Sequence, residues 1–259
     1  MSASKTEPSA LDILAIAAHR DDVEQTCGGT LLKMAQQGRR TGILDLTRGE
    51  MGTRGTAADR EREAKEAAQL LCVVWREALD IPDGRVENTW VNRLKIARVI
   101  RRTRPRVVIL PYWQGRHPDH YTCATLGYEA CFLAGLKKLE IVRKLREEGV
   151  AAQAEDDLAP HRPFKILYAT LYYDVRPTFV VDISGQFEAR FAALMAYKSQ
   201  FEDQPEGSGI FPAHQEIRDR IHSMGRFYGM MAGVKYAEPF LQKEMGLVEN
   251  LLDIPVQSI

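Results

Sequence analysis

Two short clusters rich in carboxylates and imidazoles each follow an apolar run of this chain. The first is His19–Asp22 (HRDD) and the second is His117–His120 (HPDH). A catalytic zinc ion usually takes three His, Asp or Glu ligands and keeps one position open. His19 and Asp22 can turn toward one point, and either histidine of the second cluster could complete the set. Asp21 then remains to take a proton from water, which a bound divalent ion makes more acidic.

The runs before the clusters explain how residues far apart in sequence could meet. Leu11–Ala18 (LDILAIAA) and Arg106–Tyr112 (RVVILPY) are nearly continuous apolar segments, typical of strands covered on both faces of a parallel sheet. In such sheets ligands bind beyond the carboxyl ends of the strands, where the strand order reverses. If these are the first and fourth strands, they are neighbours and both clusters face one cleft. The alternative is that the aspartates only cap a helix and HPDH is only a turn, but two such clusters together favour a metal site.

The rest of the chain alternates strand and helix patterns. Right-handed parallel βαβ units follow from such alternation, so we expect an α/β fold with a doubly wound, mostly parallel, Rossmann-like sheet. Up to residue 134, the further expected strands are Thr41–Thr47 and Val73–Asp80. The expected helices are Glu24–Gln37, Ala57–Leu71, Asn88–Thr103 and Tyr121–Ala134.

Beyond Gly135 the pattern changes. Residues 137–163 are charged and predict an irregular loop or lobe. A C-terminal extension follows, with expected strands at Lys165–Tyr173 and Phe179–Ile183 and expected helices at Phe187–Phe201 and Glu216–Met231. We interpret residues 1–259 as a single α/β domain.

Composition excludes several classes of partner. Lys+Arg and Asp+Glu number 35 each, so no overall field draws nucleic acid or an anionic membrane. The apolar stretches are too short to span a bilayer, and Asp12 and His19 interrupt any signal-peptide pattern. The four cysteines show no C-x-x-C spacing, which is typical of a reduced protein without a disulfide framework. We therefore expect a cytoplasmic protein.

The segment Ala18–Glu24 (AHRDDVE), with HPDH about a hundred residues later, resembles the PIG-L/LmbE family of zinc-dependent N-acetylglucosamine deacetylases. The likeness runs from Leu11 to Phe240. Within the family, the segments at 53–56 (TRGT), 160–163 (PHRP) and 236–240 (YAEPF) resemble the bacillithiol-biosynthesis deacetylase branch. The resemblance implies an LmbE-like fold and a homo-oligomer such as a hexamer.

The resemblance also implies a role for each matched residue. The implied ligands of Zn²⁺, or of another divalent ion, are His19, Asp22 and His120. Asp21 matches the general base, His117 the imidazole that stabilises the tetrahedral intermediate and protonates the leaving amine, and Asp119 the carboxylate partnered with that imidazole.

Three arginines are candidate substrate-binding residues. Arg60 and Arg162 match arginines near the substrate in the bacillithiol branch, while Arg54 lies on the glycine-rich loop Arg48–Gly55. Arg54 could bind a carboxylate or hydroxyl, or be an ordinary exposed loop residue. Arg20 departs from the family, which usually has proline there, and could bend the loop or add a positive charge at the rim of the cleft.

The expected function is a zinc hydrolase that removes acetate from an N-acetylglucosaminyl conjugate, with N-acetylglucosaminyl malate of the bacillithiol pathway as the first candidate. Alternatives within the family are an amidase of bacillithiol S-conjugates and a deacetylase of another N-acetyl amino sugar. A different class is a metal-free, nucleotide-binding doubly wound protein. Against that class, Gly28-Gly29 follows the acidic pair and forms no G-x-G-x-x-G run.

Overall fold

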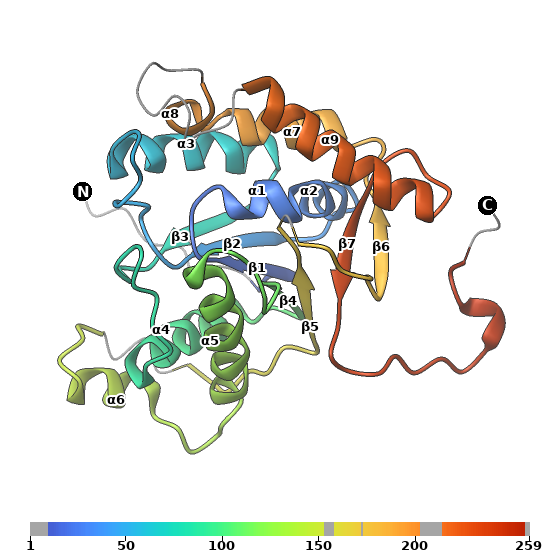
Figure 1. The fold of residues 1–259 in the computed structure, drawn as a ribbon. Helices are drawn as coiled ribbons and strands as arrows, with labels where there is room; N and C mark the ends of the chain where they lie inside the picture. Colours follow the sequence, from blue (N-terminus) through green and yellow to red (C-terminus); the bar gives the residue numbers. More distant parts are fainter. Residues whose placement is uncertain (1–9, 153–157, 172, 203–213, 257–259) are drawn as a thin grey trace.

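The computed structural model describes residues 10–152, 158–171, 173–202 and 214–256, and its centre is one seven-stranded sheet. The strand order is β3-β2-β1-β4-β5-β7-β6 (Figure 1). The first five strands in this order are parallel, and β7 pairs antiparallel with both β5 and β6. The strands are β1 (Ile13–Ala17), β2 (Thr41–Asp45), β3 (Trp75–Ala78), β4 (Val107–Pro111), β5 (Lys165–Ala169), β6 (Phe179–Asp182) and β7 (Ala237–Leu241).

The predicted mostly parallel α/β fold is confirmed, and so is the pairing that matters for the site. β1 lies between β2 and β4, with Ile13 beside Val107 and Ala15 beside Ile109. The strand order reverses between β1 and β4, because the chain builds outward through β2 and β3 on one side and β4 and β5 on the other. The carboxyl ends of these two strands therefore meet at the point where doubly wound proteins bind ligands.

Helices cover both faces of the sheet because β1 is apolar on both. Leu14 and Ile16 pack with α4 and α5, whereas Ile13 and Ala15 pack with α1 and α2 on the opposite face (Figure 1). The helices are α1 (Asp22–Thr26), α2 (Gly28–Gln36), α3 (Ala57–Leu70), α4 (Trp90–Thr103), α5 (Pro118–Ala134), α6 (Ile141–Glu147), α7 (Phe187–Met195), α8 (Lys198–Phe201) and α9 (His214–Met231), with a 3-10 turn η2 (Leu251–Asp253). No helix within the described ranges is long and apolar enough to cross a membrane.

Local signals set the ends of several helices. Thr56 accepts the Asp59 backbone N–H at 3.1 Å, and Asp59 accepts the Thr56 backbone N–H at 3.0 Å, which forms a capping box at the start of α3. Gly38 follows α2 with a φ of 79°, the left-handed conformation that glycine adopts without strain. All four cysteines lie within the described residues and carry free thiols.

Several elements differ from the sequence prediction. The helix expected at Glu24–Gln37 is divided into α1 and α2, and the helix expected at Phe187–Phe201 is divided into α7 and α8. The stretch 137–163 contains α6, whose Ile141, Val142 and Leu145 are buried, so this part is more regular than expected. β7 was not predicted as a strand, because it is short and Pro239 cannot donate to a sheet ladder. Its position between β5 and β6 makes it part of the sheet rather than of an appended lobe.

Candidate metal and catalytic site

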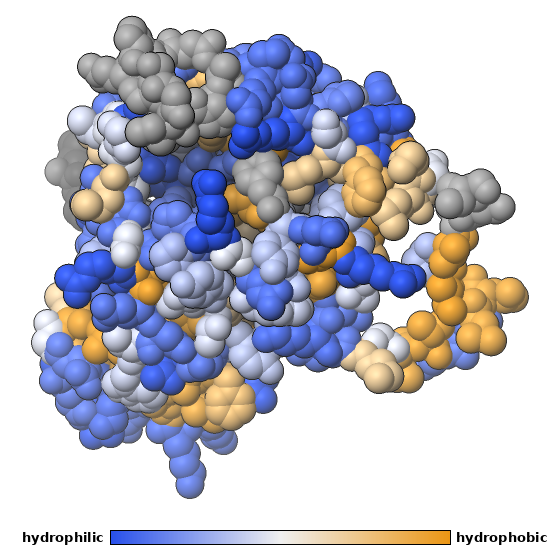
Figure 2. Space-filling model, in the orientation of Figure 1, coloured by the Kyte–Doolittle hydropathy of each residue, from blue (hydrophilic) through white to orange (hydrophobic). Residues whose placement is uncertain are grey.

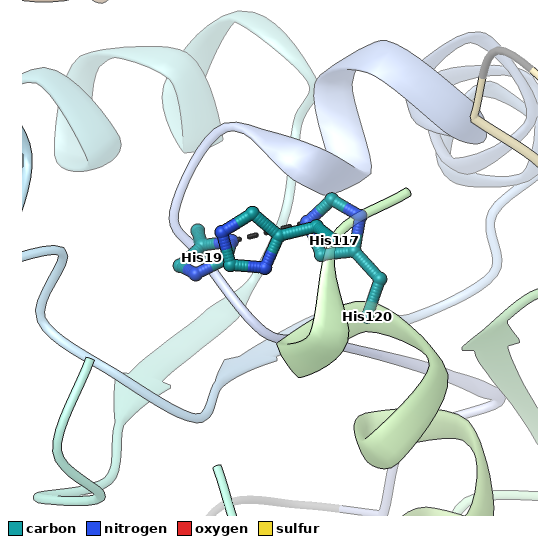
Figure 3. A group of neighbouring side chains, drawn as sticks. All are labelled: His19, His117 and His120. Carbon is teal, nitrogen blue, oxygen red and sulfur yellow. Dashed lines mark hydrogen bonds between the residues drawn. The ribbon is translucent and has the colours of Figure 1, made fainter. Parts of the chain in front are cut away.

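The two clusters meet beyond the ends of β1 and β4. His19 follows β1 directly, and His117 and His120 lie at the first turn of α5, which begins after the loop that follows β4. Figure 3 shows the three imidazoles gathered at one point. His19 forms ring contacts with both others, at centroid distances of 4.7 Å to His117 and 5.1 Å to His120. The predicted convergence of the clusters is therefore what the structure shows.

The side chains of His19, Asp22 and His120 form a tight triangle and could bind a metal ion together. His19 Nδ1 lies 3.1 Å from His120 Nε2 and 3.5 Å from Asp22 Oδ2. His120 Nε2 lies 3.2 Å from Asp22 Oδ1. With metal–ligand distances of about 2.0–2.1 Å, tetrahedral ligands are separated by about 3.3 Å. The two ring nitrogens and the Asp22 carboxylate are therefore spaced closely enough to bind one ion, with each histidine facing a different oxygen of Asp22.

His117 stands next to this triangle in a different position. A ligand atom of His117 comes within 4.8 Å of ligand atoms of His19 and His120. His117 is the N-cap of α5, and its Nδ1 accepts the backbone N–H of Asp119 at 3.2 Å. Partial burial and the neighbouring His19 and His120 lower the pKa of His117. The bond from Asp119 keeps Nδ1 as an acceptor, so the neutral ring carries its proton on Nε2.

Asp83 belongs to the site although the sequence prediction did not include it. Its Oδ1 lies 3.1 Å from His19 Nε2, the ring nitrogen that faces away from the triangle, and its side chain is only 8% exposed. It follows β3 in the turn Pro82-Asp83-Gly84, so the rule for carboxyl strand ends could have found it. The backbone N–H of Met51 donates to Asp83 Oδ2 at 2.9 Å, which ties the glycine-rich loop to the site.

Asp119 has a different partner from the one expected. The sequence resemblance paired its carboxylate with His117, but Asp119 Oδ2 lies 3.4 Å from His19 Nε2. The two carboxylate oxygens accept the backbone N–H groups of Gly84 at 2.8 Å and Val86 at 3.2 Å. These bonds turn Asp119 away from the ring of its own cap residue. Asp119 and Asp83 thus hold His19 in the manner of carboxylates that orient a ligand histidine.

The electrostatics of the cluster favour a cation. Burial lowers the pKa of His19, but the charge of Asp22 and hydrogen bonds to Asp119, Asp22 and Asp83 outweigh burial and raise that pKa from 6.5 to about 12. Burial raises the pKa of Asp22, but His120 and His19 outweigh it and hold that pKa well below its usual range. Without a metal ion, the surrounding carboxylates stabilise a proton on His19. A divalent cation bound at the same place would supply positive charge to these carboxylates.

Asp21 is held beside the triangle by two donors. Arg60 Nη2 donates to Asp21 Oδ1 at 2.7 Å, and the Gln25 side-chain amide donates to Asp21 Oδ2 at 3.0 Å. Burial lowers the pKa of Arg60, but the adjacent Asp21 outweighs burial and raises it. Arg60 was expected to bind substrate. Its guanidinium lines the cleft but is engaged with Asp21, which makes it a positioning residue for that carboxylate.

The other two predicted substrate arginines are not in the cleft. Arg162 lies over the Phe132 ring at 4.7 Å, near the C-terminal end of α5, whereas the site is at its N-terminal end, on the order of 20 Å away at 1.5 Å per residue. Arg162 precedes the parallel strand β5 and so lies at the amino edge of the sheet, outside the described lining of the cleft. Arg54 is 6% exposed, and the described residues that line the cleft include Gly52 but not Arg54.

A buried network fixes the backbone of the first cluster. Arg76 Nε and Nη2 donate to the two oxygens of Asp45 at 2.9 and 3.0 Å, and its Nη1 donates to Glu24 Oε1 at 2.7 Å. Arg76 and the Tyr197 hydroxyl both donate to the backbone carbonyl of Arg20. The Arg20 side chain is 6% exposed and lines a smaller pocket beside Asp45, so it does not add charge at the rim of the cleft.

The site opens into a cleft of about 590 Å³. The residues of the site that line it are His19, Asp21, Asp22, Asp83, His117 and His120. The lining also includes the apolar or aromatic Met51, Tyr112, Phe201 and Ile217 and the cationic Arg116 and Arg220. A volume of this size accommodates a small organic molecule. Arg116 and Arg220 are the cleft cations that sequence reasoning did not single out.

A doubly wound sheet with imidazoles and carboxylates around one point, and a further carboxylate beside them, is typical of metal-dependent hydrolases. Comparison with known proteins agrees. The family model PIG-L: GlcNAc-PI de-N-acetylase matches residues 14–131. The diacetylchitobiose deacetylase of Thermococcus kodakarensis is 31% identical over 237 residues, which cover 87% of this chain and 80% of that protein.

Solved structures support the same relationship. The conserved protein TT1542 from Thermus thermophilus is 36% identical with a TM-score of 0.77, over 93% of this chain and 98% of that one. The N,N'-diacetylchitobiose deacetylase from Pyrococcus horikoshii is 25% identical with a TM-score of 0.74, over 90% and 82% of the two chains. The chain belongs to the PIG-L family of deacetylases, which hydrolyse an amide bond.

Proposed function

We propose that this protein removes the acetyl group of an N-acetylglucosamine-containing substrate with the help of a zinc ion held by His19, Asp22 and His120. One observation carries the proposal: the ring nitrogens of His19 and His120 lie 3.1 Å apart, each within 3.5 Å of an oxygen of the Asp22 carboxylate. A further carboxylate, that of Asp21, is held beside this set but is not part of it. The related proteins named diacetylchitobiose deacetylase support the substrate class.

The donor set fits the ion. Two imidazoles and a carboxylate suit zinc, which takes nitrogen and oxygen ligands and in catalytic sites keeps a position open. A bound divalent ion there would polarise the amide carbonyl and make water more acidic. Asp83 and Asp119 support this assignment because their carboxylates contact His19 Nε2. These contacts orient the ring so that Nδ1 points toward Asp22 and His120.

The side chains of the cleft divide the proton transfers between them. Asp21 accepts the proton of the attacking water, and its bonds to Arg60 and Gln25 hold the carboxylate ready for that transfer. His117 carries a proton on Nε2 because its Nδ1 accepts from Asp119. That proton can stabilise the developing oxyanion or pass to the departing amine.

The test separates metal binding from proton transfer. Asp21→Asn should keep metal content near one ion per chain and lose on the order of a hundredfold in kcat, the scale of a positioned general base. His19→Ala should lose the metal itself, measured by elemental mass spectrometry on the same preparations. If His19→Ala keeps its metal, the ligand assignment is refuted, and if Asp21→Asn keeps full activity, Asp21 has no part in proton transfer.

Within this substrate class, we propose N-acetylglucosaminyl malate, a precursor of bacillithiol, as the specific substrate. The specific observation in its favour is that Arg116 and Arg220 line the cleft, where they could pair with the malate carboxylates. Arg220→Ala should then lower kcat/KM for the malate conjugate by about tenfold or more, while leaving N,N'-diacetylchitobiose nearly unchanged. Arg218→Ala on the same helix is the matched control, since Arg218 pairs with Glu188 outside the described cleft lining.

A further inference from the structure

The chain ends in an apolar arm that projects from the body of the molecule. This C-terminal arm, residues 242–256, runs from the end of β7 out to η2, in red at the right of Figure 1. Most of its large apolar side chains are almost fully exposed, and Val248 and Ile254 are about half exposed. Figure 2 shows the arm as a hydrophobic projection. The exposed fractions are 97% for Met245, 92% for Leu247, 81% for Leu251, 90% for Leu252 and 79% for Val256.

The arm leaves the body from a fixed root. The backbone N–H of Gln242 donates to Thr178 Oγ1 at 3.2 Å. The Lys243 ammonium lies 5.0 Å from the ring centre of Trp113, 4.7 Å from that of Tyr128 and 5.0 Å from that of Tyr168. Three aromatic faces around one cation hold this position firmly. The direction in which the arm departs is therefore set by packing.

The outer part of the arm has local order of its own. Asn250 caps η2, its side-chain oxygen accepting the Leu252 backbone N–H at 3.1 Å. The Ile254 backbone N–H returns to the Leu251 carbonyl at 3.4 Å. These bonds present Leu251 and Leu252 side by side on a preformed turn, so docking the turn costs less ordering entropy than docking a random coil.

The exposed apolar area of the arm is large enough to serve as a binding surface. If a buried aliphatic side chain removes about 60–120 Å² from water, the arm offers roughly 500 Å². The largest apolar patch on a typical monomer is about 300–600 Å² and is often functional. A standard interface covers about 800 Å² on each partner. One arm together with the surface that receives an arm reaches that size.

The same chain carries a complementary surface at the end of α9. Phe227, Met230 and Met231, which we call the α9 patch, are 49%, 63% and 52% exposed. The basic Arg226 and Lys235 flank this patch, since the Arg226 guanidinium donates to the Lys235 carbonyl at 2.9 Å.

The charge of the arm is opposite to that of the patch. Beyond Lys243 the described part of the arm carries Glu244, Glu249 and Asp253 and no basic residue. The α9 helix packs on β6 and β7, and the arm leaves from the end of β7, so α9 and the root of the arm lie on the same side of the molecule (Figure 1). A twofold axis on this side would let two copies exchange arms, which is the self-complementary arrangement of an isologous interface.

We propose that the C-terminal arm of one copy docks on the α9 patch of a second copy of this chain, with both copies contributing an arm. Leu251 and Leu252 insert among Phe227, Met230 and Met231, and the acidic residues of the arm face Arg226 and Lys235. The interface lies away from the metal site and does not depend on the proposed substrate.

Cysteine cross-linking tests the pairing directly. The double variant Met230→Cys and Leu252→Cys, mildly oxidised at micromolar concentration, should run as a disulfide-linked dimer on a non-reducing gel. Each single variant is the control for the native thiols, of which Cys72 is exposed. A disulfide within one chain would overturn the proposal, because it would show the arm folding back onto its own helix. Absence of any new disulfide would overturn it as well.

Sedimentation velocity gives the second test. Leu251→Asp combined with Leu252→Asp in the full chain should convert the assembly to a smaller particle and raise the dissociation constant at least a hundredfold. Val74→Asp is the control, because Val74 is 52% exposed beside β3, at the opposite edge of the sheet. An unchanged sedimentation coefficient for the arm variant, or a monomeric wild type at tens of micromolar, would refute the proposal.

A mixing experiment identifies the receiving surface. Met230→Glu with Met231→Glu disables the patch and leaves the arm intact, whereas the leucine variant does the opposite. Each alone should sediment as the smaller particle, but their mixture should form a mixed dimer through the one intact arm and patch. Failure of the mixture to associate, while wild type does, would show that the arm binds elsewhere.

Discussion

Replacing Arg60 distinguishes a positioning residue from a substrate-binding one. Its guanidinium donates to Asp21 at 2.7 Å, and the two side chains are 6% and 15% exposed. Arg60→Ala leaves the Gln25 amide to hold the Asp21 carboxylate without a charged partner. The carboxylate can then rotate away from the position in which it takes a proton, so we expect kcat to fall with little change in KM.

The magnitude follows from the burial of this pair. A hydrogen bond between charged groups contributes about 1.5–3 kcal/mol. Breaking a fully buried pair costs about 3–5 kcal/mol, but the partial exposure of Asp21 favours the lower range. At about 1.4 kcal/mol per factor of ten, kcat should fall roughly 10- to 150-fold. Arg60→Lys keeps the charge but not the planar fork, so it should recover part of the loss.

The assay compares two substrates in steady-state kinetics. N,N'-Diacetylchitobiose is neutral, and N-acetylglucosaminyl malate carries carboxylates. A positioning role predicts the same fractional loss of kcat on both. A loss confined to KM for the malate conjugate would refute this reasoning and restore Arg60 as a substrate ligand. Arg62→Ala on the same helix, whose side chain is 70% exposed and pairs with Asp59, should behave like wild type.

Three further predictions concern the metal and the amino edge of the sheet. The pKa of His19 is raised to about 12, so the stabilisation from its proton is complete below about pH 6.5 and lost as pH rises toward 12. A metal ion must displace that proton at pH 7–8, so calorimetry in buffers of different ionisation enthalpy should show release of at least one proton and an affinity that rises with pH. No proton release would contradict the assignment. Asp83→Asn should weaken metal binding about 10- to 100-fold, measured by chelator competition, because Asp83 faces His19 Nε2; the exposed control Asp80→Asn should not, and equal affinities would remove Asp83 from the site. Arg162→Ala should leave kcat/KM within about twofold for both substrates, and a larger, substrate-dependent loss would contradict its placement beside Phe132.

The sequence by itself determined the fold class and the meeting of the two clusters. Buried apolar runs followed directly by His19 and, after a short loop, by His117 are a local pattern. Because neighbouring parallel strands point the same way, the residues that follow them lie close together at one edge of the sheet. The same rule, applied more fully, would have included Asp83, which follows β3, and excluded Arg162, which precedes β5.

Only the tertiary structure decided which partner each charged side chain takes. Arg60 turned out to hold Asp21, Asp119 to face His19 rather than His117, and Arg20 to point away from the cleft. Long or charged side chains choose among several partners within reach, and the choice depends on neighbours brought in by distant segments. For Asp119 those neighbours are the backbone N–H groups of Gly84 and Val86, which no pattern around residue 119 contains.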